Sequence, residues 1–326
     1  MSQLQVLITV DTEFWPDPAD LSEAGLARSI GRDIYGETAS GDFGIGRQMD
    51  VLDAHGLKGV FLVEALCSQV VGLEPLRKMV ELIQSRGHDV QLHIHPEWLA
   101  WMPEPLLAER RGQNLKEFSL SEQILLLQSG LEALRQAGAK DVCAFRAGNY
   151  GADFATLRAL EHLGIRFDTS YNFCYLDAEC GLRLPRPMTQ PGPLEGVCEV
   201  PITFFSDYPG HHRHVQLRAC SFREMRGALL EAHRLAWPTF VIVSHSFELL
   251  KSAKPGRAPR PDPIVMGRFE RLCRFLAENP GKFRTSGFAD LDQGSIERSD
   301  VPSGQELKGS IVATLLRYVE QSARRV

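Results

Sequence analysis

Residues 4–10 read LQVLITV and are followed at once by Asp11-Thr12-Glu13. A short, largely apolar run of this kind is typical of a strand buried within a sheet. Because residues i and i+2 of a strand face the same way, Asp11 and Glu13 are expected to leave the strand end together. Ligands of α/β sheets and barrels bind at this carboxyl end of the strands. The acidic pair therefore predicts a site at the edge of a parallel sheet.

The rest of the chain repeats this pattern, with short apolar runs that alternate with amphipathic stretches. Further strands are expected at 59–63, 89–94, 142–145, 165–167, 197–205, 240–243 and 283–286. Helices are expected at 43–55, 74–85, 121–137, 153–163, 222–235 and 266–278. Regular alternation favours a mostly parallel sheet with helices outside it, either a barrel or a doubly wound sheet.

The C-terminal tail differs from the body of the chain. We predict one (β/α) barrel domain over residues 1–292 and a helical extension over 293–326. The tail starts polar and ends in an amphipathic helix, with apolar residues at helical spacing at Ile311, Leu315, Leu316 and Val319. Such a helix either docks on its own domain or forms the contact of a homodimer.

Composition excludes several classes of protein. The 326 residues are 44% hydrophobic and 24% charged, which is ordinary for a globular chain, and the net charge is −5. Because no basic run stands out, no nucleic-acid partner is expected. No apolar run approaches the roughly 20 residues that span a bilayer. The N-terminus lacks a basic region and a cleavage site, so we expect a cytoplasmic protein unless an export signal has been removed.

A second pair of candidate ligands is His93 and His95, which end the expected strand at 89–94. Their i, i+2 spacing again places two side chains on one face of a strand end. Two histidines and one carboxylate of the acidic pair form a ligand set for one divalent metal ion and leave a position open for water. Zinc is the metal we expect first, while cobalt, nickel, iron and manganese also suit these ligands.

Two further strand ends carry groups suited to acid–base chemistry. Arg146 precedes a turn with the sequence AGNYG, and its guanidinium is expected to pair with a carboxylate such as Asp11. His245 ends the expected strand at 240–243 and is placed to donate a proton to a leaving group. Asp168 and Asp207 are both candidates to orient His245.

Candidate substrate contacts lie in the loops. Asn149 and Tyr150 follow Arg146, where the glycines of the turn allow a ligand to approach the backbone. Trp98 and Trp101 follow the histidine pair and either stack on sugar rings or cap the barrel. The histidines at 211, 212 and 214 are expected to contact substrate rather than to hold a second metal.

Taken in order, these motifs resemble those of the polysaccharide deacetylase family, the NodB-homology or family 4 carbohydrate esterases. The matching features are an acidic motif after the first strand, a mid-chain His pair, an Arg-Gly turn and a late His after an apolar strand. The segments GHDV at 87–90 and GIRFDTS at 164–170 are also similar to those of the family. The resemblance covers roughly residues 6–291 and rests on the combination of motifs.

The resemblance implies a distorted (β/α)7 barrel that removes N- or O-linked acetyl groups from a carbohydrate. It implies that Asp11 is the general base, Arg146 its partner and His245 the general acid. For a mechanism with these roles, we expect the backbone N–H of Tyr150 to lie near the oxyanion. It implies that Glu13, His93 and His95 hold the metal.

The chain departs from the family pattern at these same motifs. Thr12 stands where the family has a second Asp, and the His pair is i, i+2 instead of i, i+4. Three alternatives stay open. They are an inactive carbohydrate-binding relative, which the substituted second Asp favours, a metal-dependent amidase of the same fold on a non-sugar amide, and an Fe(II) oxygenase, which uses the same ligand set.

Overall fold

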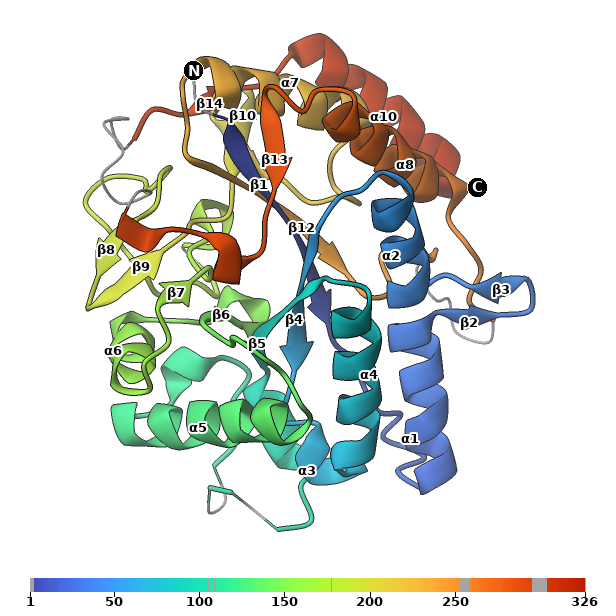
Figure 1. Ribbon diagram of the computed structural model, residues 1–326, viewed down its shortest axis with the longest axis vertical. Coiled ribbons are helices and arrows are strands. Elements are labelled where there is room, and N and C mark those ends of the chain that lie inside the picture. The colour runs from blue at the N-terminus through green and yellow to red at the C-terminus, as the bar shows by residue number, and fades with distance from the viewer. Residues whose placement is uncertain are drawn as a thin grey trace.

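A curled, mostly parallel sheet forms the centre of the computed structural model, which describes residues 3–104, 106–107, 110–176, 178–251, 258–294 and 304–325. The strands follow the order β12-β1-β4-β5-β6-β7-β9-β8, and β13 pairs with the first part of β1 (Figure 1). All of these pairs are parallel except β8 with β9. The strands are β1 (Leu4–Thr12), β4 (Gly59–Glu64), β5 (Asp89–Ile94), β6 (Ala144–Ala147), β7 (Phe167–Asp168), β8 (Gly192–Leu194), β9 (Val197–Glu199), β12 (Thr239–His245) and β13 (Phe283–Thr285).

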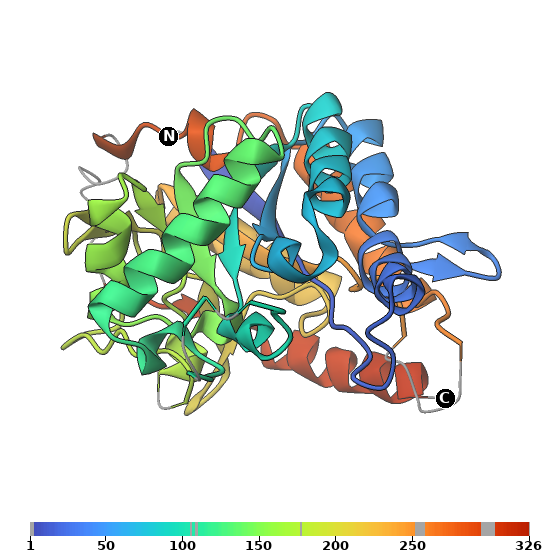
Figure 2. The ribbon, with the colours of Figure 1, turned by 90° about the horizontal axis from the view of Figure 1, so that it is seen from below.

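Helices surround the sheet (Figures 1 and 2). They are α1 (Glu23–Ile30), α2 (Ile45–Ala54), α3 (Ser68–Val71), α4 (Leu73–Ser85), α5 (Leu120–Gln136), α6 (Phe154–His162), α7 (Phe222–Arg234), α8 (Pro263–Ala277) and α10 (Ile311–Arg325). Capping boxes mark several starts: Ser119 caps α5 with Glu122, and Ser221 caps α7 with Glu224. The expected fold class, a distorted (β/α) barrel, is confirmed, with β12 and β8 at the two ends of the main strand order.

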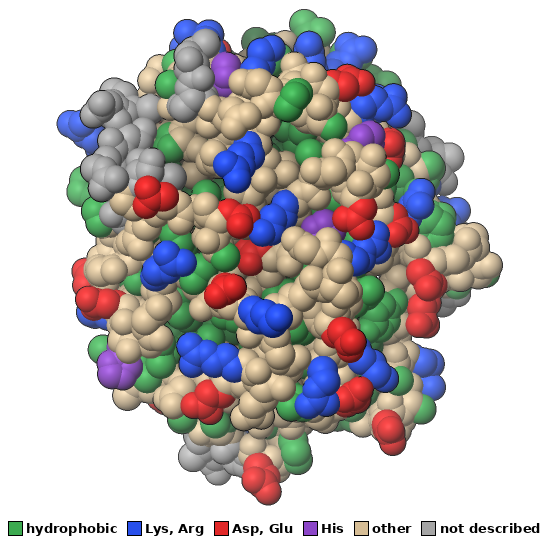
Figure 3. Space-filling model, viewed as in Figure 1, with side chains coloured by type: hydrophobic (Ala, Val, Ile, Leu, Met, Phe, Trp, Pro, Cys, Tyr) green, Lys and Arg blue, Asp and Glu red, His purple; other side chains and the backbone are tan. Residues whose placement is uncertain are grey.

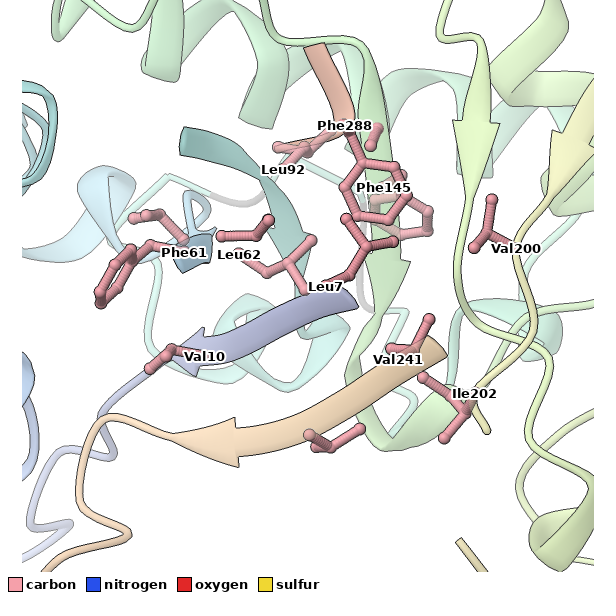
Figure 4. Packing of buried hydrophobic residues seen from close by; sticks show 14 of the residues in the cluster. Leu7, Val10, Phe61, Leu62, Leu92, Phe145, Val200, Ile202, Val241 and Phe288 are labelled. Atoms are coloured by element: carbon pink, nitrogen blue, oxygen red, sulfur yellow. The ribbon is translucent and has the colours of Figure 1, made fainter. Parts of the chain in front are cut away.

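The core explains why β1 is so apolar. Both faces of the strand are covered, and Val6, Leu7 and Val10 are fully buried. Leu7 lies opposite Val241 of β12, and Figure 4 shows Leu7 between Val241 and Leu62 of β4. The apolar run seen in the sequence is therefore the centre of the sheet.

Strand register decides which side chains share a face. Asp11 lies opposite His245 on β12 and opposite Leu62 on β4. His93 lies opposite Arg146 on β6. Opposed residues of neighbouring parallel strands point to the same face of the sheet. The register therefore brings four of the predicted site residues to one face at the carboxyl end of the sheet.

The expected strand at 197–205 is wrong in its extent. It is split into β9 and a separate strand, β10 (Phe204–Tyr208), because Pro201 has no N–H for a sheet ladder. The histidines at 211, 212 and 214, which the sequence placed in a loop, belong to a strand, β11 (His211–His214), antiparallel to β10. Val215 and Leu217 then exchange backbone hydrogen bonds with Val243, which attaches this segment to β12. A small hairpin is formed by β2 (Glu37–Thr38) and β3 (Gly41–Asp42).

The C-terminal tail packs against the body of the protein. The short strand β14 (Leu307–Lys308) pairs with β10, and the buried Arg317 of α10 binds Asp207 and Glu224 at 3.0 and 2.9 Å. The domain boundary at 292/293 stays a prediction. Among the described residues, no helix has the length and apolar character to cross a membrane. Figure 3 shows charges of both signs interspersed on one face of the molecule.

Candidate active site

A cavity of about 200 Å³ opens at the carboxyl end of the sheet. Its wall contains Asp11, Glu13, His93, His95, Ala147, Asn149, Tyr150, Tyr175, Glu179, Gln216 and His245. Seven of these were predicted site residues, and they come from β1, β5, β12, the turn after β6 and the segments that directly follow β1 and β5. Residues up to 234 positions apart in the sequence therefore meet in one small space, since 245 − 11 = 234.

Glu13, His93 and His95 form a compact cluster suited to a metal ion. Their ligand atoms lie within 4.8 Å of one another, and all three residues are buried. The Oε2 atom of Glu13 lies 2.6 Å from Nε2 of His95 and 3.3 Å from Nε2 of His93. No other such cluster occurs in the part of the chain that the structure describes.

Partners of the other ring nitrogens orient both histidines. Nδ1 of His93 donates to the carbonyl oxygen of Arg146 at 2.8 Å, so its Nε2 is directed toward Glu13. Nδ1 of His95 lies 2.7 Å from a carboxylate oxygen of Glu97. Metal-binding histidines commonly have such a carbonyl or carboxylate behind them, because it fixes the ring and the tautomer. The ligand set therefore fits a divalent metal in its orientation as well as in its chemistry.

The pKa values of Glu13 and His95 each depend on the charge of the other residue. Burial alone would raise the pKa of Glu13, but the charge and hydrogen bonds of His95 and His93 hold the pKa well below its usual range. Burial likewise opposes charge on His95, but Glu13 and Glu97 raise the pKa of His95 to about 10. A metal ion would have to displace this proton, as metals do at most histidine sites.

Asp11 and Arg146 form a buried ion pair beside the cluster. Nη1 of Arg146 lies 2.5 Å from Oδ1 of Asp11 and also donates to Oγ1 of Thr9 at 2.9 Å. Nε of Arg146 donates to the carbonyl oxygen of Thr169 at 3.2 Å. The guanidinium is completely buried, so the pair is protected from solvent screening and Asp11 is held in place.

His245 is oriented by Glu248 and not by either predicted aspartate. Its Nδ1 lies 3.1 Å from Oε2 of Glu248. Burial alone would lower the pKa of His245, but the hydrogen bond and charge of Glu248 raise this pKa to about 9. The prediction of Asp168 or Asp207 is wrong: Asp168 binds Ser170 at 2.7 Å, and Asp207 pairs with Arg317 at 3.0 Å.

The turn after β6 brings Asn149 and Tyr150 to the cavity wall. Both residues have positive φ, 54° and 58°, which is costly for residues other than glycine. Gly148 packs against the ring of His95 so closely that a Cβ atom there would lie 2.5 Å from Cγ of the ring. The glycine seen in the sequence is thus required by the approach of this turn to a candidate metal ligand.

Trp98 is a correction to the predicted substrate contacts. Its side chain is fully buried and does not line the cavity. It packs among Phe14, Trp15 and Trp101, at ring distances of 5.0, 6.2 and 5.4 Å. The indole therefore supports other aromatic side chains and has no access to a ligand. The histidines at 211–214 form part of β11, where His214 packs against Tyr150 and His212 binds Glu306.

Several residues of the site were missed from the sequence. Glu97 follows His95 by two positions and Glu248 follows His245 by three, a local signal that could have been read from the sequence. Glu64 ends β4 and accepts hydrogen bonds from the backbone N–H groups of His95 and Leu66 at 2.6 and 2.8 Å, and burial raises its pKa to about 8. Tyr175, Glu179 and Gln216 reach the cavity only through the tertiary fold.

No family profile and no curated protein sequence matches this chain. Its backbone superimposes on the structure of a candidate polysaccharide deacetylase from Mycobacterium smegmatis with a TM-score of 0.55 at 15% identity, over 94% of this chain and 95% of that one. The chain has the fold of the polysaccharide deacetylases.

Two further structures give lower scores. A family 4 carbohydrate esterase from Streptomyces lividans, in complex with acetate, matches with a TM-score of 0.42 and 8% identity over 94% of this chain and 97% of that one. A family 4 pseudoenzyme from Bacillus anthracis matches with a TM-score of 0.42 and 10% identity over 89% of this chain and 66% of that one. The assignment of the deacetylase fold rests on the mycobacterial structure.

Within this deacetylase fold, Thr12 and Glu13 differ in their position relative to the cavity. Oγ1 of Thr12 donates to the carbonyl oxygen of Val10 at 3.1 Å, and Thr12 is absent from the cavity wall. Glu13 lines the cavity because alternate residues of an extended chain share a face with Asp11. The i, i+2 spacing of His93 and His95 follows the same rule.

Proposed function

We propose that this protein is a metal-dependent hydrolase that removes acetyl groups from a carbohydrate. One observation carries the proposal: a carboxylate held by an arginine and a histidine held by a glutamate line the same cavity as a buried His-His-Glu cluster. A protein that only binds carbohydrate needs neither group. The deacetylase fold supports the substrate class, as does the order of the motifs along the sequence.

Glu13, His93 and His95 would hold the metal. When bound there, a divalent ion supplies a Lewis acid that polarises a carbonyl group and lowers the pKa of water. Zinc is proposed first because two histidines and one carboxylate are a common zinc set with an open position. The α/β fold differs from the mostly all-β folds of Fe(II) oxygenases that use the same three ligand types.

Asp11 is proposed to accept the proton of the attacking water. Arg146 orients this carboxylate through the buried ion pair at 2.5 Å. His245 is proposed to donate a proton to the departing amine or alcohol, and Glu248 keeps it protonated at neutral pH. Tyr150 and Asn149 lie on the wall where they can contact the substrate.

The size of the cavity supports a small acyl group. At about 200 Å³ it is smaller than the sites that enclose whole drug-sized ligands, which begin near roughly 300 Å³. An acetyl group with part of one ring fits this space better than a long acyl chain does. A small non-sugar amide would fit equally well, so the substrate panel below includes one.

The test is acetate release by the metal-reconstituted protein from N- and O-acetylated sugars and from small acetylated amides. We expect Asp11→Asn to keep its metal and lose activity by about 10²- to 10⁴-fold, the usual contribution of a general base. Asp50→Asn, at an exposed position on α2, is the matched control and should stay active. A fully active Asp11→Asn protein would contradict the base assignment, and release from amides alone would contradict the carbohydrate assignment.

A further inference from the structure

A second, larger hollow lies beside the candidate active site. This groove measures about 600 Å³, three times the volume of the cavity, and its wall contains Trp15, Pro96, Glu97, Ala100, Trp101, Arg111, Gly112, Gln113 and Glu117. Two half-buried tryptophans and four polar or charged side chains face one space. The groove shares no residue with the cavity wall, so it is a separate feature.

Single side chains connect the groove to the cavity. A carboxylate oxygen of Glu97, on the groove wall, contacts Nδ1 of His95 at 2.7 Å and is 3.4 Å from Nδ2 of Asn149. Trp15 packs edge to face on the ring of His95, with 4.8 Å between the ring centroids. His95 and Asn149 both line the cavity. The groove and the cavity therefore lie on opposite sides of the contact between His95 and Glu97.

The two groove tryptophans are held rigidly. The buried Trp98 lies parallel to Trp15, with an interplanar angle of 13°, and edge-on to Trp101. The backbone of Trp15 is fixed at both ends, because its N–H donates to Asp33 at 3.1 Å and its carbonyl accepts from Arg32 at 2.7 Å. Rigid aromatic faces bind with little loss of conformational freedom.

We propose that this groove is a saccharide-binding subsite, in which Trp15 and Trp101 stack on sugar rings next to the acetylated ring in the cavity. The inference rests on the proposed function and adds to it that the substrate has several rings. The flat apolar faces of pyranose rings suit tryptophan, and Glu97, Arg111 and Gln113 offer partners for ring hydroxyls. The catalytic cavity is too small for more than part of such a chain.

Binding without turnover tests this subsite. Acetylated oligosaccharides of one to four rings would be titrated into His93→Ala protein, with tryptophan fluorescence and calorimetry as readouts. We expect affinity to rise with ring number, and Trp101→Ala and Trp15→Ala to remove this gain, by about tenfold or more for the longest chain. Tyr208→Ala, an exposed aromatic on β10, is the control and should keep it.

The outcomes separate the subsite from the proposed function. Equal affinity for one and four rings, or equal gains in the tryptophan variants and wild type, would overturn the subsite and leave acetate release from single sugars untouched. Failure of acetate release from every acetylated sugar would instead overturn the proposed function. Circular dichroism of each variant shows whether the fold is kept.

The C-terminal helix α10 supports an independent inference, because its polar side faces the protein. Arg317 binds Asp207 and Glu224, Glu320 binds Arg268 at 2.8 Å, and Arg324 binds Asp262. The outer side is apolar, with Ile311, Val312, Leu315, Leu316, Tyr318 and Val319 exposed, Val312 and Val319 by 66% and 67%. A surface helix normally has the opposite orientation.

We infer that this outer face of α10 packs against the same face of a second copy of the chain. This face has the i, i+3, i+4, i+7 spacing of a helix that packs against another helix, at residues 312, 315, 316 and 319. A two-fold axis across the helix would supply a matching apolar stripe. A membrane surface fits less well, since it calls for cations beside the apolar face, whereas Arg317 and Arg324 turn to carboxylates of the protein.

Sedimentation across a micromolar range tests the helix contact. We expect wild type to form dimers and the Leu315→Glu/Val319→Glu variant to be monomeric with unchanged circular dichroism. Leu125→Glu, an exposed leucine on α5, is the control and should stay dimeric. A monomeric wild type, or a dimer that survives the double substitution, would overturn the inference. Binding of wild type to vesicles of phosphatidylcholine and phosphatidylglycerol, lost in the double variant, would also overturn it in favour of a membrane.

Discussion

At the scale of single residues, the site contains ionisable groups that are each held by a partner of opposite charge. Arg146 holds Asp11, Glu97 holds His95 and Glu248 holds His245. Glu248 raises the pKa of His245, so a protonated imidazole can stand in the same cavity as the carboxylate of Asp11. The positive charge of His245 thus depends on Glu248 as much as on the imidazole itself.

Glu248 is expected to set the alkaline limit of activity. Because it raises the pKa of His245 to about 9, the protonated acid persists up to that pH and is lost above it. In Glu248→Gln the pKa of His245 should fall toward the ordinary value near 6.5, so that activity declines at lower pH. The pH profile of kcat measures this shift.

The matched control is another histidine–glutamate pair. Nε2 of His55 lies 3.1 Å from Glu270, and neither residue lines the cavity. Glu270→Gln should leave the profile unchanged. If Glu248→Gln also leaves the alkaline limb in place, His245 is not the group that loses its proton there, and the acid assignment is wrong.

At the scale of elements, the site depends on how the turn after β6 meets the segment after β5. Gly148→Ala would place a Cβ atom 2.5 Å from the His95 ring, so the ring or the turn must move. We expect weaker metal binding, by at least tenfold, because displaced ligands and their supports typically cost that much. Metal affinity by competition with a chelating dye is the measurement.

Gly227→Ala on α7 is the control for Gly148→Ala, since nothing lies within 4 Å of the added Cβ. Alanine there should stabilise the helix by about 0.5–1 kcal/mol and leave metal affinity unchanged. Equal metal affinity in the Gly148 and Gly227 variants would mean that the turn does not position His95.

Sequence patterns predicted most of these elements for a physical reason. Period-two alternation at strand ends located Asp11, Glu13, His93 and His95, because it depends only on local geometry. Tyr175, Gln216 and the burial of Trp98 were not predicted, since all three depend on which loops meet after folding. The split between β9 and β10 has a local cause in Pro201 that the apolar pattern concealed.

At the scale of the whole molecule, buried ion pairs of one arginine attach α10 to the body of the protein. Arg317 is 1% exposed and binds two buried carboxylates, Asp207 and Glu224. Arg317→Ala would leave both carboxylates without this partner, which typically costs about 3–5 kcal/mol. We expect a corresponding loss in the free energy of unfolding, measured by denaturant titration.

The exposed ion pair of Arg28 and Asp20 is the control for the loss of stability in Arg317→Ala. The Arg28 side chain is 68% exposed, and Arg28→Ala should cost at most about 1 kcal/mol. Similar losses in the two variants would show that the tail contributes little to the stability of the barrel.

The central claim is that Glu13, His93 and His95 hold a catalytic metal ion. Elemental analysis of the purified and reconstituted protein tests it most directly, with the His93→Ala/His95→Ala variant measured in parallel. The account predicts about one divalent ion per chain in wild type and none above background in the variant. Wild-type protein that takes up no metal after reconstitution, or a variant that retains it, would contradict the account.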